Sequence, residues 1–204
     1  MDLTKKQYQW LKRAVDKCAP PEDLKSCVLM SATGFLSADR ARSHQIGDFF
    51  SAHDSNLCDG IERLSSSGEP VLSSGFKGPA QDLYSLHKPV GSLEISGRNI
   101  DLFKELSAFS CIEWDIKGYR IKARTPFFGE RWQTFVPRMS KESANNGITF
   151  RVNPKFLVDA IGIGSDYMNL SWEKEKYGML HVASYCDGVE TKALIMPMRT
   201  EGPL

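Results

Sequence analysis

A predicted strand runs directly into a predicted helix in the stretch TFRVNPKFLVDA, residues 149–160. The strand is expected over 148–152. Pro154 suits a first helical turn, because the N–H that proline lacks has no partner there, and the helix is expected to extend to about residue 161. A strand followed at once by a helix indicates a fold in which the two element types are mixed.

Strands and one further helix are predicted on both sides of this stretch. Downstream, strands are expected over 168–172, 179–185 and 192–198. Upstream, Ile100, Phe103 and Leu106 form the apolar stripe of a helix that ends near residue 109 and takes Ser96 or Asn99 as its cap. Strands are also expected over 119–124 and 132–136, and Asn145-Asn146-Gly147 is typical of a hairpin turn joining 132–136 to 148–152.

The first half of the chain shows a weaker version of the same order. A helix is predicted over 3–18 with Thr4 as its cap, followed by strands over 26–32 and 34–38 and a second helix over 54–64. Residues 70–92 are rich in Gly, Pro and Ser and show a weak strand at best. Each half therefore gives helix, strands, helix, strands. This order predicts an α+β protein of two similar domains, residues 1–92 and 93–204.

Composition excludes several classes of protein. Hydrophobic residues make up 41% of the chain and charged residues 25%, which is typical of a folded globular protein. The net charge is +1, so any nucleic-acid contact must come from local placement of charge. The five cysteines form no CxxC pair, which argues against a zinc site and favours reduced thiols in a cytoplasmic protein. No apolar run is long enough to span a membrane.

The end of the chain carries a family resemblance. ALIMPMR (residues 193–199), about forty residues after the strand-to-helix stretch, resembles the C-terminal signature of the bacterial DNA polymerase III β-subunit, the sliding clamp. SLEI (92–95) and the following helix resemble the start of the last domain of that clamp. LSADRAR (36–42) resembles a strand end of its middle domain, with Asp39 and Arg42 matching. The resemblance implies two tandem clamp-like domains, each with helices packed on antiparallel sheet.

This chain also departs from the family pattern. The family has three domains in one chain, whereas this chain has room for two, and residues 65–92 lack the strands expected there. Arg40 and Ser43 stand where the family has a small and an apolar residue. The resemblance implies a ring of six domains, so we expect three chains in a ring, as in the eukaryotic clamp, the proliferating cell nuclear antigen.

The resemblance implies a processivity factor that encircles double-stranded DNA without reading its sequence. Basic side chains of the helices would contact phosphates. The alternative is that these charges form the solvated face of amphipathic helices. The candidate DNA-binding residues are Lys5, Lys12, Arg13, Lys17, Arg98, Lys104 and Lys155.

The family also docks the DNA polymerase and the clamp loader through short apolar peptides, in a groove between domains. Methionine suits such a groove because its flexible thioether adapts to different partners. The alternative is that Met196 and Met198 are core residues of a terminal strand. The candidate groove residues are Asp39, Arg42, Leu194, Met196, Pro197, Met198 and Arg199.

Two other functions are compatible with the sequence. A clamp-like adaptor or decoy would keep the peptide groove without forming a ring. A small enzyme on an unrelated α+β fold is the third possibility, but no nucleophile or acid–base cluster stands at informative spacing, and Gly162-Ile163-Gly164 follows a helix and lacks a third glycine. We therefore expect a protein that is not an enzyme, with no catalytic residue, metal or cofactor.

Overall fold

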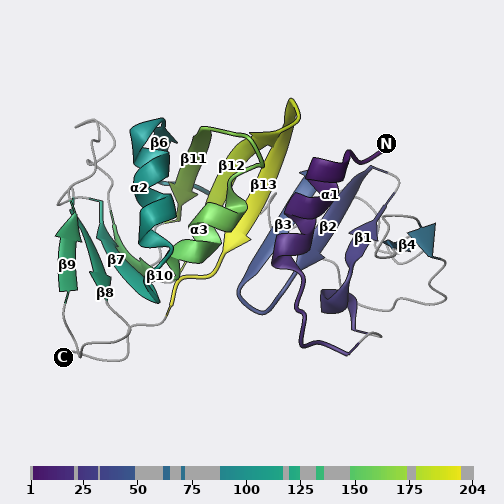
Figure 1. The fold of residues 1–204 in the computed structure, drawn as a ribbon, viewed down its shortest axis with the longest axis horizontal. Helices are drawn as coiled ribbons and strands as arrows, with labels where there is room; N and C mark the ends of the chain where they lie inside the picture. The colour runs from purple at the N-terminus through teal and green to yellow at the C-terminus, as the bar shows by residue number, and fades with distance from the viewer. Residues whose placement is uncertain are drawn as a thin grey trace.

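A computed structural model describes residues 2–20, 23–31, 33–48, 62–64, 70–71, 88–116, 120–124, 132–135, 148–173 and 178–198. Within these ranges, three α-helices pack on two antiparallel sheets (Figure 1). The α+β class predicted from the sequence is confirmed.

The first half begins with α1 (Lys5–Leu11), which continues as one 3₁₀ turn, η1 (Lys12–Ala14). Thr4 caps α1 as predicted: its hydroxyl accepts from the Gln7 N–H at 3.2 Å, and the Gln7 side chain accepts from the Thr4 N–H at 2.9 Å. The expected extension to residue 18 is wrong, because Val15 is extended and the Asp16 N–H donates to the Lys25 carbonyl instead of continuing the helix.

The strands of the first half are partly as predicted. β1 and β2 lie within the two expected strands, but β3 was not predicted, and the expected helix over 54–64 is wrong at its end, where β4 pairs with β1. Residues 54–61 lie outside the described residues. The elements are η2 (Leu24–Ser26), β1 (Val28–Met30), β2 (Gly34–Ala38), β3 (Arg42–Gly47), β4 (Glu62–Leu64) and β5 (Pro70–Val71).

The second half follows the predicted order more closely. The helix after β6 is capped by Gly97, at φ 53°, and not by Ser96, which lies in β6, or by Asn99, which lies in the helix. Asn153 caps the next helix, and Pro154 occupies its first turn as predicted. The elements are β6 (Gly91–Ser96), α2 (Arg98–Leu106), β7 (Cys111–Asp115), β8 (Arg120–Arg124), β9 (Trp132–Phe135), β10 (Thr149–Val152), α3 (Pro154–Ala160), β11 (Tyr167–Trp172), β12 (Leu180–Cys186) and β13 (Val189–Ile195).

The strands form one large and one small sheet. The large sheet has the order β5-β4-β1-β2-β3-β13-β12-β11-β6, so it joins the two halves of the chain through β3 and β13. The small sheet has the order β10-β7-β8-β9. The hairpin expected between 132–136 and 148–152 is wrong, because β9 and β10 lie on opposite edges of the small sheet, and β10 pairs with β7.

Within the described residues, one structural unit occurs three times: a helix followed by a three-stranded antiparallel meander. The units are α1 with β1-β2-β3, α2 with β7-β8-β9, and α3 with β11-β12-β13. The second half thus contains the expected helix, strands, helix, strands. The described part of the first half contains one unit.

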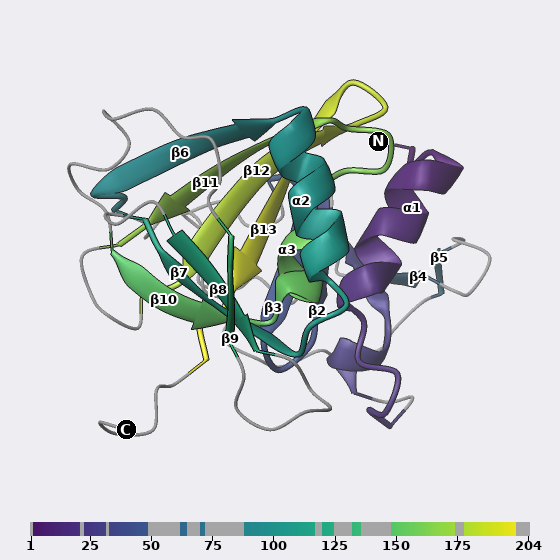
Figure 2. The same cartoon turned by 60° about the vertical axis from the view of Figure 1, so that its left-hand side comes forward.

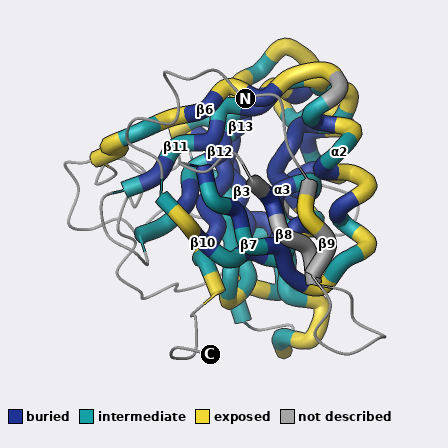
Figure 3. Tube along the Cα trace, turned by 90° about the vertical axis from the view of Figure 1, so that its left-hand side faces the viewer, coloured by how far each residue is buried: buried dark blue, intermediate teal, exposed yellow. Residues whose placement is uncertain are grey.

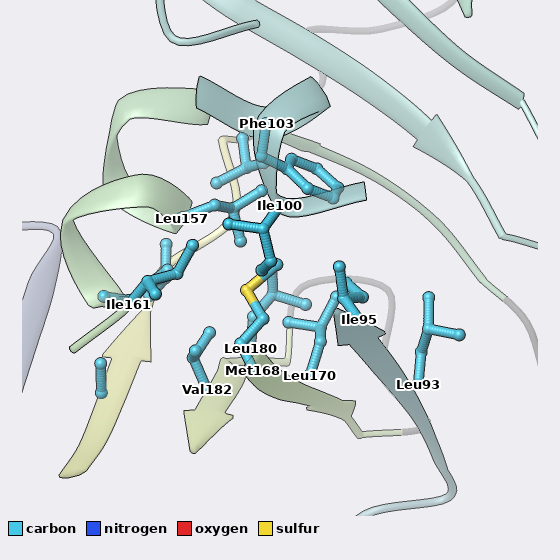
Figure 4. Packing of buried hydrophobic residues seen from close by; sticks show 14 of the residues in the cluster. Leu93, Ile95, Ile100, Phe103, Leu157, Ile161, Met168, Leu170, Leu180 and Val182 are labelled. Carbon is cyan, nitrogen blue, oxygen red and sulfur yellow. The ribbon is translucent and has the colours of Figure 1, made fainter. Parts of the chain in front are cut away.

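The core of the second half lies between α2, α3 and the large sheet. Ile100 and Phe103 of α2 and Leu157 of α3 point toward Met168 and Leu180 (Figure 4). Phe103 also meets Trp114 of β7, with ring centroids 4.9 Å apart, so α2 contacts both sheets. Along α2, buried positions alternate with exposed ones (Figure 3). The helices therefore keep one face toward solvent.

The junction between the halves is a continuous strand pairing covered by two helices. β3 and β13 pair antiparallel over Arg42–Ile46 and Thr191–Ile195. α1 and α3 lie side by side on the same face of this pairing (Figures 1 and 2), and the Trp10 indole donates to the Ala160 carbonyl at 3.2 Å. His44 of β3 is fully buried and stacks on Trp10, with ring centroids 4.3 Å apart.

The tip of the β12–β13 hairpin forms a second connection, the Asp187 clasp. Asp187 and Gly188 both have positive φ, which turns the chain tightly toward the start of α1. The Asp187 carboxylate accepts from the Thr4 hydroxyl at 2.7 Å and from Lys6 Nζ at 3.1 Å. The Gln7 amide donates to the Cys186 carbonyl at 3.2 Å. The clasp therefore fixes the first turn of α1 to the second half.

The structure bears on cysteine pairing, metal clusters and membrane-spanning helices only within the described ranges. There, Cys18, Cys27, Cys111 and Cys186 form no disulfide, and no cluster of His, Cys, Asp or Glu could hold a metal ion. In the same ranges, no helix combines the length and the apolar character that a membrane crossing needs.

The buried His44 makes stability depend on pH. Its Nδ1 donates to the Trp10 carbonyl at 3.0 Å, and burial lowers its pKa from 6.5 to about 3. As the pH falls from 6.5 toward 3, His44 takes up a proton in the unfolded chain, whereas its imidazole stays neutral in the folded protein. We expect a loss of up to about 4–5 kcal/mol in the free energy of unfolding over this interval.

Urea denaturation at several pH values measures this loss. His44→Phe keeps an aromatic ring on Trp10 and should remove this part of the pH dependence. His181→Phe, which removes a histidine elsewhere, should retain it. The same pH dependence in the His44→Phe variant and the wild type would show that the proton uptake occurs at another group.

Candidate functional site

A basic hollow lies on the helical face of the molecule, at the junction of the two halves. Its volume is about 390 Å³. Four of the predicted DNA-binding residues line it, Lys12, Arg13 and Lys17 from the first half and Lys155 from α3. The structure thus brings together charges that are more than 130 residues apart in the sequence. The other lining residues are Gln9, Val15, Arg42 and Asp159.

Arg42 lies beneath this hollow and connects both halves. Its guanidinium forms ion pairs with Asp39, at 2.9 Å, and with Asp159 of α3, and it also donates to the Arg13 carbonyl. The guanidinium carbon lies 4.5 Å from the centroid of the Phe156 ring. Because the Arg42 side chain is only 10% exposed, these contacts hold β3, η1 and α3 together in a partly desolvated cluster.

Asp159 is the acid of the hollow, and it was not among the predicted site residues. Lys155 donates to both of its carboxylate oxygens, at 2.7 and 3.0 Å, and Arg42 bonds one of them. Burial alone raises the pKa of the Asp159 carboxyl, but the hydrogen bonds from Lys155 and Arg42 outweigh it and hold that pKa below its ordinary value. The four-residue spacing of Lys155 and Asp159 is a signal that could have found this pair.

Arg13 also joins the helices. Its guanidinium donates to the carbonyls of Asp159, at 3.4 Å, and Ile161, at 3.2 Å, at the C-terminal end of α3. A cation at the end of a helix is favoured by the partial negative charge of its last carbonyls. Arg13 is therefore partly engaged inside the protein, whereas Lys12 and Lys17 are exposed.

The other predicted DNA-binding residues lie outside the hollow. Lys5 is exposed on the first turn of α1. Lys104 is exposed on α2 and pairs with Asp101 at 2.9 Å, which offsets its charge. Arg98 begins α2, but its side chain is not among the described ones.

The segment after β13 crosses from the large sheet to the small one. Ile195 pairs with Arg42, the Met196 N–H donates to the Ala41 carbonyl at 2.8 Å, and the Met198 N–H donates to the Arg151 carbonyl of β10 at 2.8 Å. Met196 is 56% exposed and Met198 45% exposed. These methionines are therefore surface residues held by their backbone and not core residues of a terminal strand.

The other predicted groove residues behave differently. Leu194 is only 3% exposed and presents no surface to a partner, which corrects its place in the expected groove. Asp39 holds the turn into β3, accepting from the N–H groups of Ala41 and Arg42 at 2.7 and 2.9 Å. Pro197 is half-buried between the two methionines. Arg199 lies outside the described residues.

Comparisons with known proteins agree with this architecture. Neither a protein-family model nor a curated protein matches the sequence. Solved structures of bacterial DNA polymerase III β-subunits do match, over nearly the whole chain. The chain has the sliding-clamp fold.

Three of these clamps show the extent of the likeness. The Helicobacter pylori β clamp bound to a DNA ligase peptide has a TM-score of 0.63 at 12% identity, over 96% of this chain and 63% of that one. The Pseudomonas aeruginosa clamp bound to griselimycin gives 0.62 at 13%, over 94% and 62%. The Streptococcus pyogenes β subunit gives 0.64 at 13%, over 92% and 61%. At this identity the sliding-clamp fold is what is shared, and this chain spans about three-fifths of each clamp.

The Arg42 cluster should stabilise the junction measurably. Arg42→Met removes the charge and leaves Asp159 partly desolvated with one cation fewer, so we expect the free energy of unfolding to fall by about 3 kcal/mol. Lys104→Met, which breaks an exposed pair, should cost less than about 1 kcal/mol. Urea denaturation at neutral pH measures both. Equally small losses in the two variants would mean that the cluster does not hold the halves together.

Proposed function

We propose that this chain is a clamp-like protein of DNA replication that contacts duplex DNA through its helical face and docks partner proteins through the Met196–Met198 segment. The observation that carries the proposal is the basic hollow on a sliding-clamp fold, where three exposed lysines meet: Lys12 of η1, Lys17 from the turn after it, and Lys155 of α3. The role involves no catalytic step and no cofactor. We place it in the cytoplasm, with DNA and other replication proteins as its partners.

The hollow suits phosphate groups better than bases. Lys12, Lys17 and Lys155 are exposed ammonium groups on flexible stems, which bind phosphates as point charges and do not read base edges. Asp159 limits the net positive charge, because Arg42 and Lys155 already pair with it. Contacts of this kind do not depend on sequence and are compatible with movement along DNA.

The two exposed methionines suit an apolar peptide. Their backbone is fixed by the bonds to Ala41 and Arg151, so the side chains are presented without ordering a loop. Met side chains adapt to different partners. The Helicobacter pylori clamp of similar fold binds a DNA ligase peptide, which supports peptide binding here. The partners we propose are a DNA polymerase and a clamp loader.

In the first form of the proposal, three chains form a ring that encircles DNA, and each chain contributes two domains, residues 1–92 and 93–204. A second form is the adaptor that binds the same partners without a ring. A ring slides off linear DNA and is retained on closed circles, whereas an adaptor shows no such difference.

Binding of a linear duplex of unrelated sequence tests the DNA contact. The triple variant Lys12→Ala, Lys17→Ala, Lys155→Ala should weaken binding on any sequence. It should also reduce the slope of log affinity against log salt by about one for each phosphate that the variant no longer neutralises. Lys88→Ala, an exposed lysine just before β6, is the matched control. Unchanged affinity and salt slope in the triple variant would show that DNA does not contact the hollow.

Peptide binding tests the second surface. Met196→Ala and Met198→Ala should each weaken a DNA ligase clamp-binding peptide by roughly fivefold or more, as removal of an apolar anchor does. Because both side chains are exposed, the melting temperature should stay close to that of the wild type. Tyr185→Ala, at another exposed apolar residue, is the control. Fluorescence anisotropy measures the affinity, and equal binding by all three variants would place the peptide elsewhere.

A further inference from the structure

The segment after β13 carries the two most exposed methionines of the described residues. Met196 is 56% exposed and Met198 45% exposed, whereas Met168 is fully buried in the core. Met30 and Met179 are partly buried. Access to solvent therefore separates Met196 and Met198 from the other methionines that the structure describes, and it does so on the surface proposed for peptide docking.

An exposed thioether reacts with peroxide, a two-electron oxidant. The sulfur of Met196 or Met198 takes one oxygen from hydrogen peroxide, the O–O bond breaks, and the sulfoxide and one molecule of water are formed. The sulfur is oxidised and the peroxide is reduced. Methionine sulfoxide reductase reverses the step: the oxygen leaves as water while a pair of thiols is oxidised to a disulfide.

This reaction changes the docking surface and leaves its backbone in place. A sulfoxide is polar, so it must give up bound water before it can lie against an apolar anchor of a peptide. The bonds that hold the segment run from the Met196 N–H to the Ala41 carbonyl and from the Met198 N–H to the Arg151 carbonyl. Oxidation of the sulfur does not alter these backbone groups. The segment therefore keeps its position and loses its affinity for apolar side chains.

Met168 differs because the core protects it. Its side chain is fully buried and lies below Ile100 of α2 (Figure 4). A protein interior is packed too tightly to admit peroxide, so a core methionine reacts only when the protein opens. Mild oxidation of the folded chain therefore reaches the surface sulfurs first, before the fold is damaged.

We propose that Met196 and Met198 form a reversible oxidation site that switches off peptide docking. Peroxide converts their thioethers to sulfoxides and weakens the hold on the peptide, and reduction restores it. The two sulfurs stand on either side of Pro197, so oxidation of one removes one apolar anchor and oxidation of both removes two. This regulation rests on the proposed docking function.

Limited treatment of the whole chain with hydrogen peroxide, stopped with catalase, tests the site. Peptide mapping by mass spectrometry should show sulfoxide at residues 196 and 198 while Met168 stays reduced and the circular dichroism spectrum is unchanged. Fluorescence anisotropy with a DNA ligase clamp-binding peptide free of methionine and cysteine should then show at least about fivefold weaker binding. Treatment with methionine sulfoxide reductases should restore the original affinity.

The double variant Met196→Leu, Met198→Leu is the control. Leucine keeps an apolar anchor of similar volume without a sulfur, so this variant should bind the peptide and lose no affinity after peroxide. If it does not bind, the variant Met30→Leu, Met179→Leu carries the comparison, because it should respond to peroxide as the wild type does.

Unchanged peptide affinity after complete oxidation of residues 196 and 198 would overturn the switch. So would oxidation of Met168 before the two surface methionines, or an equal loss of affinity in the Leu double variant. Absence of peptide binding by the untreated wild type would overturn the docking function itself, and the switch with it.

Discussion

The structure depends on the antiparallel pairing of β3 with β13. This pairing converts two separate meanders into one sheet and sets α1 beside α3. Without it, Arg42 would not reach Asp159, and Lys12 and Lys17 would not share a hollow with Lys155. The backbone pairing alone does not fix the helices above it. Arg42 below the hollow and the Trp10–His44 stack complete the junction, because both involve buried groups whose partners lie in a different element.

Local sequence signals were enough to predict the elements that depend mainly on interactions between residues close together in the chain. The Thr4 cap, Pro154 in the first turn of α3 and the last three strands were all found. β3 was missed because Ser43, His44 and Gln45 are polar, yet His44 and Gln45 are buried by contacts with distant elements. The hairpin between β9 and β10 was wrongly predicted for a related reason. A turn signal is local, whereas the pairing of β10 with β7 depends on contacts across the whole sheet.

The candidate site was predictable in part, and only through the family resemblance. The resemblance named Lys12, Lys17 and Lys155 as candidates, but nothing in the first half of the sequence indicates that Lys155 lies beside the other two. The pairing of Lys155 with Asp159 follows from helical spacing, whereas the approach of Arg42 to Asp159 requires the tertiary fold. The exposure of Met196 and Met198 also needed the structure, since a strand continuing through them would have buried alternate side chains.

The Asp187 clasp has a consequence for the time at which the beginning of the chain acquires its structure. A helix of seven residues is too short to persist in water by itself. The carboxylate that holds its first turn lies 183 residues after Thr4. During synthesis on the ribosome, Thr4 and Lys6 emerge long before Asp187, so the bonds that hold the first turn of α1 to the second half form only after residue 187 has been made.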